Sequence, residues 1–116
     1  RYFPSLYYNK SYIEGNTTVD FVMIDTIELC DYLFIGGHYP VYSISSHGPT
    51  QCLIDRLLPL LIKYNVNAYF AGHDHSLQHM ESDGITYIVS GAASRSDQST
   101  KNRKTIEDMG VKIFYQ

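Results

Sequence analysis

Two short apolar segments, each closed by glycine and separated by an amphipathic stretch, constrain the fold of this chain more than any other feature. Residues 32–35 run into Gly36-Gly37, and residues 67–71 run into Gly72. Between them, apolar residues recur at helical spacing: Leu53, Ile54, Leu57, Leu58, Leu61 and Ile62. Because short apolar runs that end in glycine turns are typical of interior strands, the sequence predicts a strand, a helix and a strand joined by a right-handed parallel crossover.

The predicted helix has a start, a kink and an end in the sequence. Thr50 follows Pro49 and is a candidate N-cap. Pro59 lacks a backbone donor and should kink the helix, and Asn65 should end it. Further strands are predicted over the apolar runs, and the polar stretch 94–104 is predicted to be a loop. The additional strand ranges are 19–25, 85–90 and 111–115.

Length and composition restrict the class of protein. At 116 residues the chain has room for one domain, and its 44% hydrophobic and 18% charged residues are ordinary for a folded protein. A formal net charge of -3 without a basic block gives no support for nucleic-acid binding. Nor does any apolar run approach the roughly 20 residues that a membrane span requires. We therefore expect a single α/β domain without a nucleic-acid partner.

Three histidines stand at or just beyond the glycine-ended strands. His38 lies in GGHYP, and His73 and His75 lie in GHDH. Residues at i and i+2 of an extended chain point the same way, so His73 and His75 can face one place while Asp74 points elsewhere. One histidine after a strand is more often a loop residue, but three at the ends of strands joined by one crossover favour a metal site. Neutral imidazoles suit zinc, iron or manganese.

The motifs around these histidines resemble a known family. GGHYPVYS, SHGPTQC and NAYFAGHDHSLQ are similar to the last two metal-binding motifs of the purple acid phosphatases, most closely the small tartrate-resistant members. FPSLYY, MIDTIELC and YIVSGAAS extend the resemblance through nearly the whole chain. The resemblance implies part of an α/β metallophosphatase fold, a β-sandwich flanked by helices.

The same resemblance implies a chemistry and roles for particular residues. The implied reaction is hydrolysis of phosphate monoesters at acid pH by a binuclear metal centre, Fe(III) with Fe(II) or Zn(II). By position in the motifs, His38 and His73 would bind the divalent metal and His75 the ferric iron. His47 would contact the substrate phosphate and protonate the leaving group.

Neighbouring side chains receive simpler interpretations. Tyr39 and Tyr42 are expected to pack as pocket walls, since aromatic residues beside a site more often line it than react. His79 matches no family ligand and is expected at the surface.

Sequons and cysteines indicate the secretory route. Asn9 and Asn16 begin N-glycosylation patterns, and Asn16 falls where the family carries a glycan. Two cysteines permit one disulfide without demanding it. The resemblance places Cys30 and Cys52 where the family has a disulfide. We therefore expect a secreted or lysosomal protein.

The chain also departs from the family pattern. None of the family's earlier motifs, GDxG, GDxxY and GNH, occurs in it. Only residues 26–31 separate the predicted strands 19–25 and 32–35, too few for a parallel crossover. Either those strands are antiparallel neighbours or a segment is deleted near 30–31. We expect residues 1–116 to be the C-terminal part of a single calcineurin-like metallophosphoesterase domain that is incomplete at its N-terminal side.

Such a chain is expected to show little phosphatase activity by itself and to expose apolar strand faces. Two alternatives remain open. One is another calcineurin-like phosphoesterase, such as a phosphodiesterase, and the other is a noncatalytic secreted glycoprotein that binds a metal or a partner.

Overall fold

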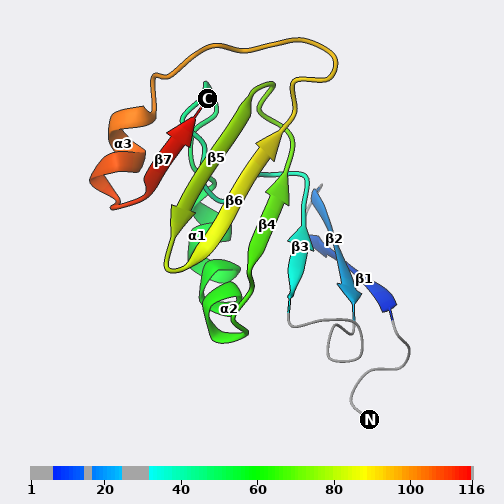
Figure 1. The fold of residues 1–116 in the computed structure, drawn as a ribbon. Coiled ribbons are helices and arrows are strands. Elements are labelled where there is room, and N and C mark those ends of the chain that lie inside the picture. The colour runs from blue at the N-terminus through cyan, green and yellow to red at the C-terminus, as the bar shows by residue number, and fades with distance from the viewer. Residues whose placement is uncertain (1–6, 15–16, 25–31, 116) are drawn as a thin grey trace.

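A five-stranded mixed sheet forms the centre of the chain (Figure 1). The structure is a computed structural model that describes residues 7–14, 17–24 and 32–115. The strand order is β3-β4-β6-β5-β7, in which β3, β4 and β6 run parallel and β5 runs antiparallel to β6 and β7. The strands are β3 (Phe34–Gly36), β4 (Ala68–Ala71), β5 (Leu77–Ser82), β6 (Ile85–Ser90) and β7 (Lys112–Tyr115). The predicted α/β class is therefore confirmed.

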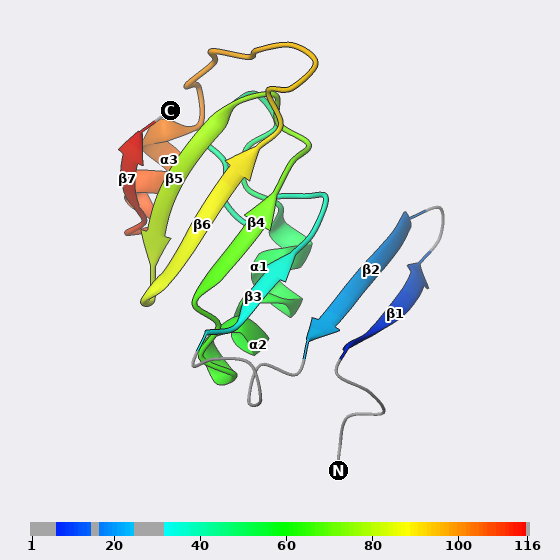
Figure 2. The same cartoon turned by 45° about the vertical axis from the view of Figure 1, so that its right-hand side comes forward.

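A separate antiparallel hairpin lies beside β3. Its strands are β1 (Tyr7–Glu14) and β2 (Thr17–Ile24), which pair with each other and not with the five-stranded sheet. Figure 2 shows β2 running next to β3. The predicted strand at 19–25 is thus β2, and its neighbour β1 was not predicted. The proposed deletion near 30–31 falls outside the described residues and stays a prediction.

Two short helices connect β3 to β4 and cover one face of the sheet. They are α1 (Gln51–Arg56) and α2 (Leu58–Lys63), with Thr50 as the N-cap of α1. The axis breaks at Leu57 because Pro59, in the first turn of α2, cannot donate a backbone hydrogen bond to the preceding turn. One kinked helix was predicted, and the kink is strong enough to make two. The parallel pairing of β3 with β4 confirms the parallel crossover.

A tight hairpin that was not predicted joins β5 to β6. Asp83 and Gly84 both have positive φ, 54° and 74°, which suits a two-residue turn whose twist matches the strands. The turn sets the register that pairs Ser82 with Ile85. It also brings the chain segment after His75 back along β6, toward the histidine-bearing edge.

The polar stretch 94–104 is a loop only in its first part. Helix α3 (Arg103–Asp108) begins inside the predicted loop and anchors itself through Ile106, which is fully buried. A single turn and a half of helix with one buried apolar residue has too weak a period to be seen in sequence. Among the described residues, no helix is long and apolar enough to cross a membrane.

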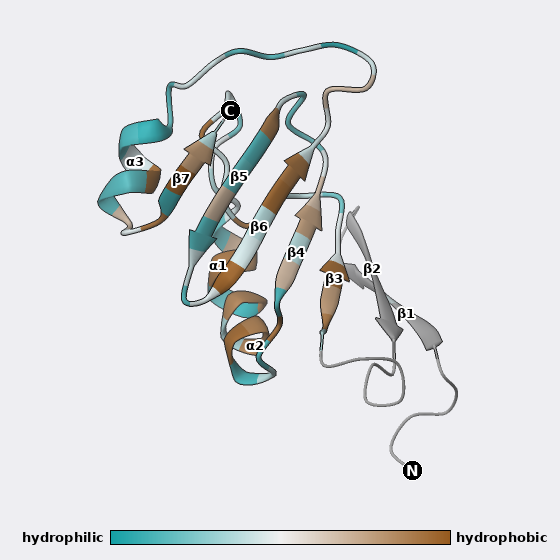
Figure 3. Cartoon of the chain, in the orientation of Figure 1, coloured by the Kyte–Doolittle hydropathy of each residue, from teal (hydrophilic) through white to brown (hydrophobic). Residues whose placement is uncertain are grey.

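The two faces of the sheet differ in burial. Along the strands, Figure 3 shows β3 and much of β6 as hydrophobic and β5 as largely hydrophilic. The face toward α1 and α2 carries Tyr69, Tyr87 and Met80, each at most 3% exposed. On the other face Phe34 and Phe70 meet edge to face, and Phe114 stacks on His79, while all three phenylalanines are about half exposed. Hydrophobic burial therefore stabilises the described fold mainly from one side. The core side chains are Val41, Tyr42, Ile44, Leu57, Leu61, Val66, Tyr69, Ala71, Met80, Ile85, Tyr87, Val89, Ile106 and Val111.

Candidate histidine site at the sheet edge

The parallel pairing of β3 and β4 places His38 and His73 at one edge of the sheet. Their loops are tied together, since Gly37 N donates to Phe70 O at 2.9 Å and Gly72 N donates to His38 O at 3.0 Å. His73 has a φ of 61°, an uncommon conformation for a residue other than glycine and one that turns the chain sharply after β4. Strand-end placement, as the sequence predicted, brings these two histidines together.

The rings of His38 and His73 meet edge to face, with their centroids 5.2 Å apart. His73 Nδ1 lies 3.2 Å from His38 Nε2, and the Tyr39 ring packs 4.2 Å from the His73 ring, measured between centroids. Burial, followed by the neighbouring His47 and His38, lowers the pKa of His73 from its usual value. Because this environment favours the neutral imidazole, His73 keeps a lone pair available near neutral pH. Tyr39 is a wall of this site, as predicted.

His47 reaches the same site from the loop between β3 and α1. Its ring centroid lies 4.5 Å from that of His73, and its Nδ1 hydrogen-bonds the Asp74 carboxylate. Asp74 is fully buried, whereas the His47 side chain is 58% exposed. The buried carboxylate therefore holds one ring nitrogen and leaves Nε2 directed outward. The contact between Asp74 and His47 was not predicted.

A buried network of polar side chains holds Asp74 in place. Ser43 Oγ donates to Asp74, and Gln78 Nε2 lies 2.9 Å from Ser43 Oγ. The same amide nitrogen approaches the hydroxyls of Ser45 and Ser76 at 2.9 and 2.7 Å, while Gln78 Oε1 accepts from Ile44 N at 2.9 Å. Gln78 is 0% exposed, so each of these bonds replaces one to water. This network was not predicted.

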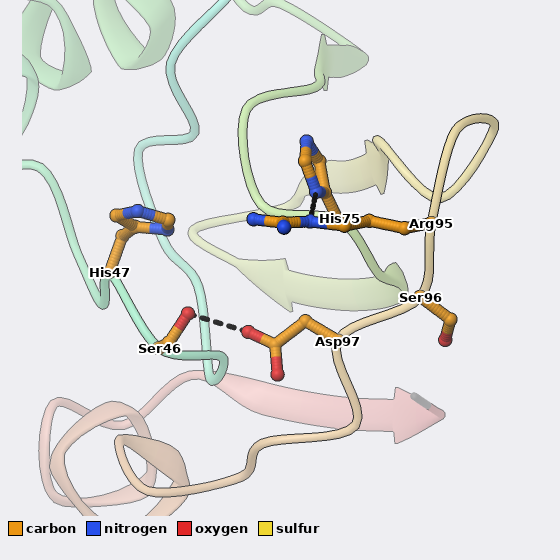
Figure 4. A pocket seen from close by; sticks show the side chains of 6 residues that line it. All are labelled: Ser46, His47, His75, Arg95, Ser96 and Asp97. Atoms are coloured by element: carbon orange, nitrogen blue, oxygen red, sulfur yellow. Dashed lines mark hydrogen bonds between the residues drawn. The ribbon is translucent and has the colours of Figure 1, made fainter.

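His75 lies in a neighbouring pocket of about 380 Å³ (Figure 4). Arg95 Nε donates to His75 Nδ1 at 2.9 Å, and Ser46 Oγ donates to Asp97 Oδ2 at 2.5 Å. The Ser46 hydroxyl and then the Ser99 N–H lower the pKa of Asp97, which is therefore a carboxylate at neutral pH. Arg95 and Asp97 were not predicted as site residues. The pocket is lined by Ser46, His47, His75, Arg95, Ser96 and Asp97.

The described residues supply part of the coordination of one metal ion and do not by themselves complete a binuclear centre. Two tetrahedral ligands about 2.05 Å from one ion lie about 3.3 Å apart, close to the 3.2 Å between the His38 and His73 nitrogens. However, no group of three or more His, Cys, Asp or Glu side chains within the described ranges is arranged to hold a metal ion. His75 is occupied by Arg95. The three-histidine ligand set therefore stays a prediction, supported for His38 and His73 by their distance.

Other predicted residues lie elsewhere. Tyr42 is not a pocket wall, because it is 4% exposed and packs edge to face on Tyr87 in the core. His79 is half-buried under Phe114 and Tyr115 on the open face of the sheet.

The disulfide and glycan predictions are not tested. Cys52 is exposed at the start of α1, whereas Cys30 and Asn16 lie outside the described residues. Asn9 falls in β1. The Cys30–Cys52 disulfide and both glycosylation sites stay predictions.

Together the fold and the site define a mixed α/β protein with a histidine-rich candidate active site at the carboxyl edge of a parallel strand pair. A solved chain described as "GAP50 the anchor in the inner membrane complex of Plasmodium" shares the fold, with a TM-score of 0.55 and 22% identity. That likeness covers 79% of this chain and 39% of the solved one. No family model matches the sequence.

Curated relatives identify the family. Tartrate-resistant acid phosphatase type 5 is 45% identical in Oryctolagus cuniculus and 43% identical in Homo sapiens, each over 73% of this chain. Purple acid phosphatase 17 of Arabidopsis thaliana is 41% identical over 68% of the chain. The chain belongs to the purple acid phosphatase family. It spans about a quarter of the length of these relatives, 26% of both mammalian proteins.

Proposed function

We propose that the protein containing this chain is an acid phosphatase that hydrolyses phosphate monoesters. The observation that carries the proposal is the 45% identity over 73% of the chain to a protein named an acid phosphatase. The site geometry supports it, since His47, His38 and His73 meet at the strand ends where α/β proteins bind their ligands.

His47 is proposed as the proton donor to the leaving group. Hydrolysis forms a bond between phosphorus and a water oxygen and breaks the bond between phosphorus and the ester oxygen, which leaves as an alcohol when a proton reaches it. Asp74 holds Nδ1 of His47, so the outward Nε2 is the nitrogen that can carry this proton.

His38 and His73 are proposed to contribute to the binuclear centre of Fe(III) with Fe(II) or Zn(II) that the family implies. Such a centre supplies Lewis acidity and neutralises charge on the phosphate when it is bound. The contribution of this chain is to hold two imidazole nitrogens 3.2 Å apart, backed by the Tyr39 ring. His75 is the third proposed ligand, on condition that Arg95 releases its Nδ1.

The test compares His47→Gln with His79→Gln in the protein as its gene encodes it, supplied with iron and zinc. Substrates are an activated aryl phosphate and an alkyl phosphate with a poor leaving group, assayed at acid pH. We expect His47→Gln to lower turnover of the alkyl phosphate by about 100-fold or more, and that of the aryl phosphate less. His79 is the matched control because its ring stacks on Phe114, away from the site.

Equal losses for both substrates would assign His47 to phosphate binding and remove its role as an acid. If the unsubstituted protein hydrolyses neither substrate with any supplied metal, the phosphatase proposal is wrong. A phosphodiester turned over faster than the monoesters would favour the other calcineurin-like phosphoesterases.

A noncatalytic role is the second candidate, because within the described residues no three-ligand metal group is present and Arg95 occupies His75. In that case the site binds an anion or a metal without turnover. Zinc binding to an inactive protein, lost in His38→Gln, would support it.

We also propose passage through the secretory pathway to a secreted or lysosomal destination. The supporting features are the sequons at Asn9 and Asn16 and the Cys30–Cys52 pair. A mass shift on deglycosylation, absent in Asn16→Gln, is the measurement. An unmodified Asn16 in protein secreted from eukaryotic cells would contradict the glycan.

A further inference from the structure

Arg95 is hydrogen-bonded to His75, one of the three histidines predicted to bind a metal. Its Nε donates to His75 Nδ1 at 2.9 Å, and a guanidinium can only donate. Nδ1 therefore accepts, so the neutral His75 ring carries its proton on Nε2. While this bond persists, neither nitrogen of His75 offers a lone pair to a metal ion.

The bond also fixes the direction of the guanidinium. Figure 4 shows Arg95 extending past His75, with its terminal nitrogens toward the side of the pocket that holds His47. Those nitrogens are paired with no carboxylate among the described residues. The Arg95 guanidinium is planar, with one edge held by His75 and the other directed into the pocket. This geometry suits bidentate binding of an oxyanion.

The pocket residues include a single carboxylate, that of Asp97. Both oxygens of Asp97 are engaged, Oδ2 by Ser46 Oγ and Oδ1 by Ser99 N at 2.9 Å. The Asp97 backbone N–H also donates to His75 O at 2.6 Å, which ties the 94–100 loop to the histidine segment. Asp97 is thus held by Ser46 and Ser99 and forms no ion pair with Arg95.

We propose that Arg95, with the outward Nε2 of His47, forms a phosphate-binding site that works without a metal ion. His75 orients the guanidinium through Nδ1 and in this state belongs to the anion pocket, while His38 and His73 form a separate imidazole pair. The inference deepens the proposed function, because it takes the anion to be the phosphate of substrate or product.

The test is titration of the purified protein with inorganic phosphate in the presence of a chelator, followed by the NMR signals of arginine Nε. Sodium chloride at equal ionic strength replaces phosphate in a parallel titration. We expect a millimolar Kd for the unsubstituted protein and a shift of the Arg95 signal with phosphate only. Arg95→Gln should weaken binding at least fivefold. Arg95→Lys keeps the charge without the planar fork and should be intermediate.

Lys63→Gln is the matched control, since it also removes one positive charge but lies at the end of α2, before β4 and away from the strand ends. It should bind phosphate within twofold of the unsubstituted protein. Equal affinity in Arg95→Gln, equal loss in Lys63→Gln, or binding that appears only after metal is added would each overturn the inference.

Hydrolysis is measured separately. If phosphate binding requires Arg95 but the protein hydrolyses no substrate, only the proposed function is wrong. If the protein hydrolyses substrate but phosphate binding does not require Arg95, only this inference is wrong.

Discussion

The two sides of the histidine site are held in different ways. On one side, which we term the anchored side, His47 is bonded to Asp74, Asp74 accepts from Ser43, and Ser43 accepts from Gln78. Asp74, Ser43 and Gln78 are fully buried. On the other, the paired side, His38 and His73 contact each other and the Tyr39 ring, which is 43% exposed. The residues that support His47 are buried, whereas the paired side lies on the surface.

That difference separates two kinds of preorganisation. Buried hydrogen bonds are strong because water cannot replace them, so the orientation of His47 is maintained by the fold itself. The exposed His38–His73 pair competes with water, and its geometry becomes fixed when a ligand holds both nitrogens. Substitutions on the anchored side should therefore affect stability, whereas those on the paired side should mainly affect binding.

The largest effect is expected from Gly91→Ala. A Cβ at Gly91 would lie 2.1 Å from the backbone oxygen of Asp74, so the segment that presents Asp74 must move. We expect the free energy of unfolding to fall by about 3 kcal/mol, measured by urea denaturation.

Gly36→Ala is the control on the paired side, because nothing lies within 4 Å of its added Cβ. Its effect should stay below about 1 kcal/mol. Comparable losses in the two variants would show that the anchored side is no more tightly packed than the paired side.

A smaller effect is expected from Gln78→Ala. The change removes the acceptor of Ile44 N and the donor shared by the hydroxyls of Ser43, Ser45 and Ser76, leaving buried polar groups without partners. We expect a loss of about 2 kcal/mol in the free energy of unfolding. Gln51→Ala, which breaks only an exposed 2.8 Å bond to Asp55, should change it by less than about 0.5 kcal/mol. A Gln78→Ala protein as stable as Gln51→Ala would mean that the network contributes nothing.

The smallest effect concerns the buried support of the paired side. Tyr69 OH donates to Tyr39 O at 2.9 Å, and Tyr69→Phe should lower the free energy of unfolding by about 1 kcal/mol at neutral pH. Tyr87→Phe is its counterpart, because the buried Tyr87 hydroxyl has no partner in the described part of the chain. Removing that hydroxyl should leave stability unchanged or raise it. If Tyr87→Phe lowered the free energy of unfolding more than Tyr69→Phe, the stabilising hydroxyl would be that of Tyr87 and not that of Tyr69.

The same tyrosine makes the comparison depend on pH. Burial raises the pKa of Tyr69 from 10.0 to about 12, so the folded state resists loss of the phenol proton. Its contribution to stability is fully present below pH 10 and is lost as pH rises from 10 to about 12. Tyr69→Phe should therefore lose less stability than the unsubstituted protein across that range. Identical alkaline unfolding profiles would contradict the raised pKa.

Local pattern was enough for the elements with a clear period. Residues 85–90 form β6 with the predicted bounds, and Pro59 disrupts the helix near the predicted position, because alternation and a lost backbone donor are properties of the chain itself. Local pattern did not predict β5, because its residues Leu77–Ser82 mix polar and apolar types although the strand lies inside the sheet. Helix α3 was missed for a similar reason, since its single buried residue defines no period.

The sequence by itself determined that His38 and His73 would share one sheet edge, since glycine-ended parallel strands joined by a crossover must finish on the same side. Only the tertiary structure decided the partners of His47 and His75. Asp74 meets His47 across 27 residues, and Arg95 meets His75 across 20. Neither contact could be predicted from a periodic pattern in the sequence. Such contacts depend on how the loops after β3, β4 and β6 converge over the sheet, and that convergence follows from packing in three dimensions.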